Sequence, residues 1–147
     1  MHKFIRNILL MIFIQGFHYP PATHDITVKL RVHGNDARLT EKIFSDLRSD
    51  LGNKSNIVIV SDTTDSSAFT ITVQYATLKT GDKLVAFFIN SLLTRRIRTS
   101  KDESADQLIK SSVSSTANVS DIDRLCAKFV DEFDVQYFEK ERIKTAR

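Results

Sequence analysis

The sequence predicts an α+β protein built as a two-layer sandwich, in which an antiparallel meander sheet carries two helices on one face. Three observations support this fold class. Apolar residues alternate from Phe69 to Tyr75 and continue from Leu84 to Ile89, and the turn-favouring residues 79–82 between them predict a long β-hairpin. Two other segments place their apolar residues on single helical stripes. The expected order is strand, helix, strand, strand, strand, possible strand, helix.

Length and composition predict a single folded domain. The chain has 147 residues, of which 41% are hydrophobic and 27% charged, which is typical of a globular protein that buries its own core. Ten Phe and no Trp predict a Phe-rich core. We expect this domain to cover residues 23–147.

The first 22 residues have the layout of a secretory signal peptide. Lys3 and Arg6 precede the apolar run Ile8 to Phe17, and Tyr19 to Ala22 then interrupts any helix with two prolines. The run is shorter than the roughly 20 residues that span a bilayer. The sequence therefore predicts a periplasmic or secreted protein. Two alternatives stay open: an inner-membrane protein anchored by residues 8–17, and an apolar first element of a cytoplasmic domain.

Charge and cysteine content exclude two further classes. Without Lys3 and Arg6, 19 basic residues remain against 18 acidic ones, so the expected mature protein has a net charge of only +1. Such a balance does not indicate a nucleic-acid partner. The single cysteine, Cys126, excludes a disulfide within the chain.

The first half of the domain predicts a strand, a helix and a second strand. Apolar and polar residues alternate in Asp25–Val32, which predicts a strand with one solvated face. A helix follows from about Ala37 and ends at Gly52-Asn53; its apolar stripe comprises Leu39, Ile43, Phe44, Leu47 and Leu51. Asn56–Val60 predicts a short strand with both faces buried, and 62–67 predicts a polar loop.

The two arms of the hairpin differ in character. The first arm alternates, whereas the second arm is apolar on both faces, with Leu84, Ala86 and Phe88 on one side and Val85, Phe87 and Ile89 on the other. Such a strand needs cover on both sides or a partner. Two helices on one sheet face cannot supply both.

The second arm continues into a basic segment, residues 94–98. Residues 101–104 predict a turn, and Gln107–Ser115 predicts a third antiparallel strand, with a mobile loop as the alternative. The cluster Arg95, Arg96, Arg98 and Lys101 would suit an anionic surface or an acidic partner protein. The alternative is that these charges protect a strand end from aggregation.

Ser120 is the expected start of the final helix. Ser120 to Asp123 approximates a capping box, with acids at the positive end of the helix dipole. The apolar stripe that follows comprises Ile122, Leu125, Cys126, Phe129, Val130, Phe133 and Tyr137.

Catalytic and metal-binding patterns are weak in this sequence. His24, His33 and Cys126 are too few and too scattered to predict a metal site, and Cys126 is expected to be buried in the core. A small hydrolase would have to combine His33 with a serine of the 111–115 run. The acids Asp131, Glu132 and Asp134 are interpreted as a solvated helix face. No cofactor or catalytic residue is predicted.

One segment resembles a known family layout. LTEKIFSDLRSDLGNKSNIVIVSDTTDSSAFTITVQY is similar to the helix, strand, polar loop and alternating strand of the amino-terminal domain of TolB and related outer-membrane accessory proteins. The tail segment DIDRLCAKFVDEFDVQYFEKER resembles the closing helix of small uncharacterised exported bacterial proteins. The resemblance implies an envelope location and a protein-binding role, and it provides no catalytic residues.

The functional hypothesis is that this protein works by binding, through the second arm of the hairpin. The expected partner is another envelope protein or a second copy of the chain, with an anionic surface as a further possibility and no nucleic acid or small-molecule cofactor. The candidate binding residues are Phe87, Ile89, Arg95, Arg96, Arg98 and Lys101.

Overall fold

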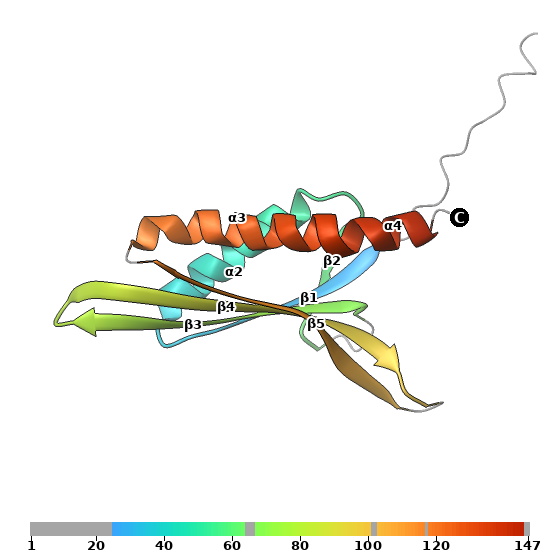
Figure 1. Cartoon of the computed structure of the whole chain (residues 1–147), viewed down its shortest axis with the longest axis horizontal. Helices are drawn as coiled ribbons and strands as arrows, with labels where there is room; N and C mark the ends of the chain where they lie inside the picture. The colour runs from blue at the N-terminus through green and yellow to red at the C-terminus, as the bar shows by residue number, and fades with distance from the viewer. Residues whose placement is uncertain (1–24, 64–66, 101–102, 117, 146–147) are drawn as a thin grey trace, which may run out of the picture.

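The computed structural model describes residues 25–63, 67–100, 103–116 and 118–145, apart from the side chains at 84, 119 and 145. They form two layers (Figure 1). One layer is a five-stranded sheet with the strand order β2-β1-β3-β4-β5. The other holds helix α2 (Ala37–Gly52) and, on the same face of the sheet, α3 (Ile122–Phe133) continuing to α4 (Glu139–Thr145). The predicted two-layer α+β class is confirmed.

The sheet is mixed, so the prediction of a wholly antiparallel meander is wrong for its first half. β1 (Ile26–His33) lies between β2 (Ile57–Val60) and β3 (Phe69–Thr80) and is parallel to both. Helix α2 carries the chain back to the end where β1 began, and this crossover makes the next strand parallel. The antiparallel meander is confined to β3, β4 (Lys83–Arg98) and β5 (Ser104–Thr116).

The predicted hairpin and the uncertain strand are both confirmed. β3 and β4 are joined by a tight turn in which Gly81 adopts a positive φ of 59°, a conformation that glycine allows at little cost. A β-bulge lies between Leu78 and Lys79. β5 pairs with β4 from Ser104 to Thr116, so this segment is a strand and not a loop.

Asp36 fixes the start of helix α2. Its carboxylate Oδ1 accepts hydrogen bonds from the backbone N–H groups of Arg38 (3.0 Å) and Leu39 (3.2 Å), which satisfies donors that the helix itself leaves unpaired. These hydrogen bonds lower the pKa of the Asp36 carboxyl, and the bond from the Leu39 N–H has the largest effect. At the other end the N–H of Asn53 bonds to the carbonyl of Ser49 (3.1 Å), and the helix ends where the sequence predicted.

The final helix begins differently from the prediction. A short 3-10 turn, η1 (Val119–Asp121), precedes α3, and Asp121 at the N-cap makes no side-chain capping bond. The capping box expected at Ser120 is therefore absent. The two acids have other partners: the Asp121 carboxylate accepts the Thr116 hydroxyl (2.9 Å), and Asp123 pairs with Lys42 of α2. Asp123, the last residue of the expected box, is thus used to join α3 to α2.

A π-helical turn, η2 (Asp134–Phe138), connects α3 to α4. The stripe predicted from a 3.6-residue period placed Tyr137 in the core after Phe133. In the structure Phe138 is fully buried and Tyr137 only half-buried. In a π turn the backbone hydrogen bonds join residues five apart rather than four. The fifth residue after Phe133, which is Phe138, therefore points into the core.

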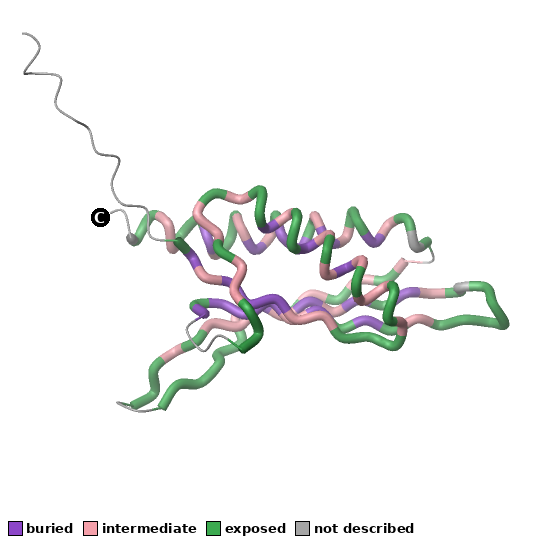
Figure 2. Tube along the Cα trace, turned by 180° about the vertical axis from the view of Figure 1, so that it is seen from behind, coloured by how far each residue is buried: buried purple, intermediate pink, exposed green. Residues whose placement is uncertain are grey.

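The core lies between the sheet and the helices and is rich in phenylalanine, as predicted (Figure 2). The Phe69 and Phe138 rings meet edge to face with centroids 5.2 Å apart, joining β3 to η2. The largest fully buried side chains include Phe87, Phe129, Phe133, Phe138, Ile43, Leu47 and Leu51.

Several predictions concern residues outside those described. They are the signal peptide at 1–22, the alternative anchor at 8–17, His24 and Lys101. Among the described residues, no helix combines the length and apolarity that crossing a membrane requires.

Candidate binding surface

The second arm of the hairpin presents its two sides to different surroundings. Phe87, Ile89 and Leu93 are fully buried, on the side of β4 that faces the helices. Phe88 lies between two of them in sequence and is 48% exposed, because successive residues of a strand point to opposite faces. The prediction that Phe87 and Ile89 contact a partner is therefore wrong: both belong to the core.

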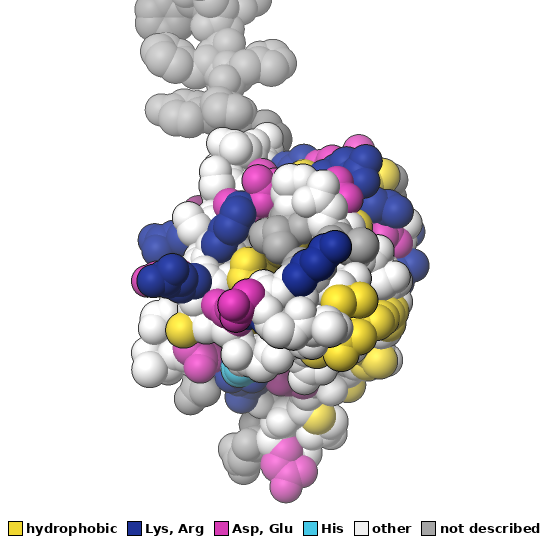
Figure 3. Space-filling model, turned by 90° about the vertical axis from the view of Figure 1, so that its left-hand side faces the viewer, with side chains coloured by type: hydrophobic (Ala, Val, Ile, Leu, Met, Phe, Trp, Pro, Cys, Tyr) yellow, Lys and Arg dark blue, Asp and Glu magenta, His cyan; other side chains and the backbone are white. Residues whose placement is uncertain are grey.

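Exposed apolar side chains gather on the face away from the helices. Leu78 of β3 is paired with Ala86 of β4, which precedes Phe88 by two residues, and Val113 of β5 is paired with Asn90, two residues beyond Phe88. Leu78 is 55% exposed and Val113 is 72% exposed. We call Leu78, Ala86, Phe88 and Val113 the open-face patch. Figure 3 shows hydrophobic side chains gathered to one side of this end of the molecule.

The patch is confined to the outer part of the sheet. On the same face, the first arm of the hairpin carries Thr70, Thr72 and Gln74, which are polar. Within the described residues both helical segments lie on the opposite face, so neither covers the patch. Contiguous exposed apolar groups on a folded protein are typical of interaction sites.

The arginine cluster does not form one surface. Arg95 points to the helix side, where its guanidinium bonds to Glu141 of α4 (3.1 Å) and lies 5.7 Å from the centroid of the Phe69 ring. Arg96 is exposed and its Nε bonds to Ser104 Oγ (2.8 Å). Arg98 is exposed near the end of β4. Strand alternation separates neighbouring arginines onto two faces, which the sequence pattern could have indicated.

Arg95 lines a hollow of about 420 Å³ between β5 and the last helix. Lys140 and Lys144 supply further positive charge there, and Glu141 is ion-paired with both Arg95 and Lys144. That an anionic partner binds in this hollow stays a prediction.

The hydrolase hypothesis lacks the required geometry. His33 is at the end of β1, and the serines of the 111–115 run are on β5, with β3 and β4 between them. Three strand spacings of about 4.8 Å separate such positions by roughly 14 Å, whereas a base must come within hydrogen-bond reach of its nucleophile. The chain does not bring this pair together.

The acids of the last helix are solvated to different degrees: the Asp131 side chain is 65% exposed, as predicted, whereas the side chains of Glu132 and Asp134 are 22% and 18% exposed. Asp131 pairs with Lys54 at the end of α2 (2.6 Å) and Glu132 pairs with Lys110 of β5 (2.9 Å). Asp134 pairs with Arg142 of α4. The Glu132–Lys110 pair joins α3 to the sheet, and the other two pairs join parts of the helical layer.

Cys126 is fully buried on the inner side of α3, as predicted. Burial, followed by the nearby carboxylates of Asp46 and Asp50, raises the pKa of the thiol to about 12. Such a thiol is inert at neutral pH. In the part of the chain that the structure describes, no group of three or more His, Cys, Asp and Glu side chains converges to hold a metal ion.

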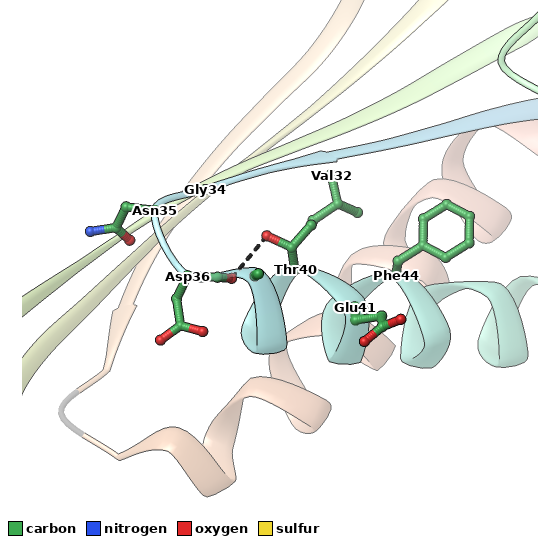
Figure 4. A pocket seen from close by; sticks show the side chains of 8 residues that line it. Val32, Gly34, Asn35, Asp36, Thr40, Glu41 and Phe44 are labelled. Carbon is green, nitrogen blue, oxygen red and sulfur yellow. Dashed lines mark hydrogen bonds between the residues drawn. The ribbon is translucent and has the colours of Figure 1, made fainter.

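A hollow of about 740 Å³ at the junction of β1 and α2 was not predicted (Figure 4). Val32 and Phe44 supply apolar walls, while Glu41 and the cap residue Asp36 lie at its border. Thr40 donates its hydroxyl to the carbonyl of Asp36 (3.0 Å). In the sequence, Gly34, Asn35 and Asp36 favour a turn and a helix cap and do not indicate a hollow.

Comparisons with known proteins provide little further information. No family model and no curated protein matches the chain. Solved structures with some similarity include a hypothetical protein from Chlamydia trachomatis (8% identity, 63% of this chain and 71% of that chain, TM-score 0.38). A second is an uncharacterised protein (11% identity, 83% of this chain and 95% of that chain, TM-score 0.35). A third is rare lipoprotein B from Shewanella oneidensis (9% identity, 81% of this chain and 99% of that chain, TM-score 0.32). The resemblance to the TolB domain remains an expectation.

Proposed function

We propose that this protein acts by binding another protein of the bacterial envelope and that the open-face patch is the contact surface. The observation that carries this proposal is the exposure of Leu78, Phe88 and Val113 on the sheet face opposite the helices. Removing large apolar side chains from water drives most protein association. These three residues are not part of the buried core cluster.

The envelope location rests on the amino-terminal sequence. The basic start, the short apolar run at 8–17 and the two prolines that follow are the pattern of an export signal. An exported domain meets envelope proteins after transport, which sets the class of partner.

The charges around the patch define the partner further. Lys83 lies at the tip of the hairpin, and Arg96 and Arg98 lie towards the other end of β4, whereas Lys79 is paired with Asp36 at the start of α2 (3.5 Å). A surface with an apolar centre and acidic groups at its rim would complement this arrangement. Rim charges of this kind increase the association rate and make it sensitive to salt.

Site-specific photocrosslinking in the native host tests the proposal. A photoreactive phenylalanine analogue replaces Phe88 in the full chain, and the same analogue replaces Val135 as the control. Val135 is an exposed apolar residue (62%) in the helical layer, so both positions tolerate the change.

The expected result is one discrete adduct from position 88, identified by mass spectrometry as an envelope protein, and no such adduct from position 135. The purified partner should then bind the wild-type protein directly. The proposal is overturned if position 88 gives no adduct, or if both positions capture the same set of proteins, because site-independent capture indicates only non-specific contact.

A further inference from the structure

Strand β5 leaves one side of its backbone unpaired. Within the described residues it pairs only with β4, and its outer side forms an edge of the sheet along 13 residues. The opposite edge is β2, which has only four residues. A long edge strand is a template for pairing with another strand, and proteins usually protect it with charges, prolines or bulges.

Only the first half of β5 has such protection. A register irregularity near Ile109 shifts its pairing with β4, and Asp106 adds charge there. The second half, Lys110–Thr116, has the sequence KSSVSST, which contains no proline, no acid and no bulge. Its single charge is at its first residue. This half is a regular, unprotected edge.

We propose that a second copy of this chain pairs with Lys110–Thr116 as an antiparallel strand, with Val113 of the two copies directly opposite each other. The two copies are related by a two-fold axis perpendicular to the sheet, so both helical layers lie on the same side of the combined sheet. Each residue must then be paired with a residue whose side chain points to the same face of the sheet. Val113 is the centre of the seven residues, so this register uses the whole unprotected half. It also pairs the most exposed of the large apolar side chains with its own copy.

The remaining pairs in this register are compatible. Ser112 lies opposite the second copy's Ser114, and Ser111 lies opposite its Ser115, which places small side chains together. Lys110 lies opposite the second copy's Thr116, whose hydroxyl donates to the carboxylate of Asp121 (2.9 Å). Lys110 is already paired with Glu132 of its own chain (2.9 Å), so its charge is balanced within each copy. No like charges are directly opposite, an arrangement that would be destabilising.

This pairing goes beyond the proposed envelope contact, with which it shares Val113, a residue of the open-face patch. The second copy occupies the edge of the sheet, whereas the envelope partner contacts its open face. Phe88 is paired with Ser115 of β5, so the two open-face patches would become parts of one continuous ten-stranded sheet. A dimer would thus present the patch twice to its partner.

Disulfide trapping tests the register. Directly opposite residues of antiparallel strands have Cα atoms about 4.5–5.5 Å apart, within the roughly 4.4–6.8 Å that a disulfide spans. Val113→Cys in the full chain is therefore expected to form a covalent dimer under mild oxidation. The matched control is Leu108→Cys, an exposed apolar residue of the same strand that lies beyond the bulge. The native Cys126 is buried and does not compete.

Sedimentation velocity gives the second readout. The wild-type chain should show a reversible dimer at micromolar concentration, and Val113→Lys should weaken it at least tenfold by placing two lysines together, with folding unchanged. The proposal is overturned if the wild-type chain stays monomeric at about 100 μM, or if Leu108→Cys forms the covalent dimer as fast as Val113→Cys. Either result leaves the crosslinking test at Phe88 unaffected.

Discussion

Gly34→Ala is expected to destabilise the fold strongly through a single steric conflict. Gly34 follows β1 at the turn into α2, and a Cβ atom placed there would overlap Cε1 and Cζ of the Tyr75 ring and lie 2.5 Å from Cδ1. Tyr75 is buried and stacks on Phe87 with ring centroids 5.4 Å apart. Stacking on Phe87 limits the movement of the ring on one of its faces.

The Tyr75 hydroxyl sets the size of the effect. It bonds to the Thr40 hydroxyl (2.8 Å) and to the carbonyl of Asp36, and so it ties the start of α2 to β3. Forcing an extra methyl group into a packed site costs about 1–3 kcal/mol, and each lost hydrogen bond adds about 1 kcal/mol. We expect Gly34→Ala to lower the free energy of unfolding by about 2–4 kcal/mol.

Urea unfolding followed by circular dichroism measures this loss. The midpoint should fall by about 1–2 M with an unchanged slope. Gly52→Ala is the matched control, because a Cβ atom at Gly52 meets nothing within 4 Å. Because Gly52 is helical, Gly52→Ala should instead raise the free energy of unfolding by up to about 1 kcal/mol.

A double-mutant cycle isolates the steric cause. In a Tyr75→Ala background the ring is absent, so Gly34→Ala should cost almost nothing. If Gly34→Ala alone changes stability by less than about 0.5 kcal/mol, or if it costs as much without the ring as with it, the packing argument fails.

Three other predictions follow from single buried or charged groups. Ser91→Ala should raise the free energy of unfolding by about 1 kcal/mol, since within the described residues the buried Ser91 Oγ has no hydrogen-bond partner; an unchanged or lower urea midpoint would contradict this. Cys126 should react with a thiol reagent at pH 8 only after unfolding, and fast labelling of the native protein would refute this. Because the pKa of Cys126 is raised in the folded state, the thiol ionises first in the unfolded state, so the free energy of unfolding should fall between pH 9 and about 12. Asp50→Asn should stabilise the protein at pH 7, because burial and the charges of Asp46 and Asp131 raise the Asp50 pKa and disfavour its ionised form; the gain should vanish below pH 3.8, where both states hold the proton, and a gain that persists there would point to another cause.

Patterns of period two and period 3.6 predicted most of the elements. Alternation in 69–75 and the helical stripe of Ile43, Leu47 and Leu51 depend only on which residues face the core, so they can be read locally. The direction of strand pairing cannot be read in this way. β1 and β2 are parallel because of the path that α2 takes between them, and an apolar strand such as IVIV fits either direction.

The sequence indicates the strand on which the candidate surface lies but not which of its residues are exposed. The sequence indicated that β4 is apolar on both sides, yet it gave no sign of which side the helices cover. The sequence predicts that Phe87 and Ile89 contact a partner, whereas Phe88, which lies between them, is the exposed residue. The bulge near Ile109 likewise shifts Leu108 relative to Val113, and no residue type marks it in advance. The π turn that replaces Tyr137 by Phe138 in the core is a similar case.

The most direct test of a binding role for the open-face patch is the ratio of two dissociation constants. Leu78→Asp places a charge in the patch, and Val135→Asp places the same charge on an exposed apolar position of the helical layer. With the partner identified by crosslinking at Phe88, we predict that Leu78→Asp weakens binding at least tenfold and that Val135→Asp leaves it within twofold of the wild type. Equal affinities for the two variants would contradict a binding role for the open face of the sheet.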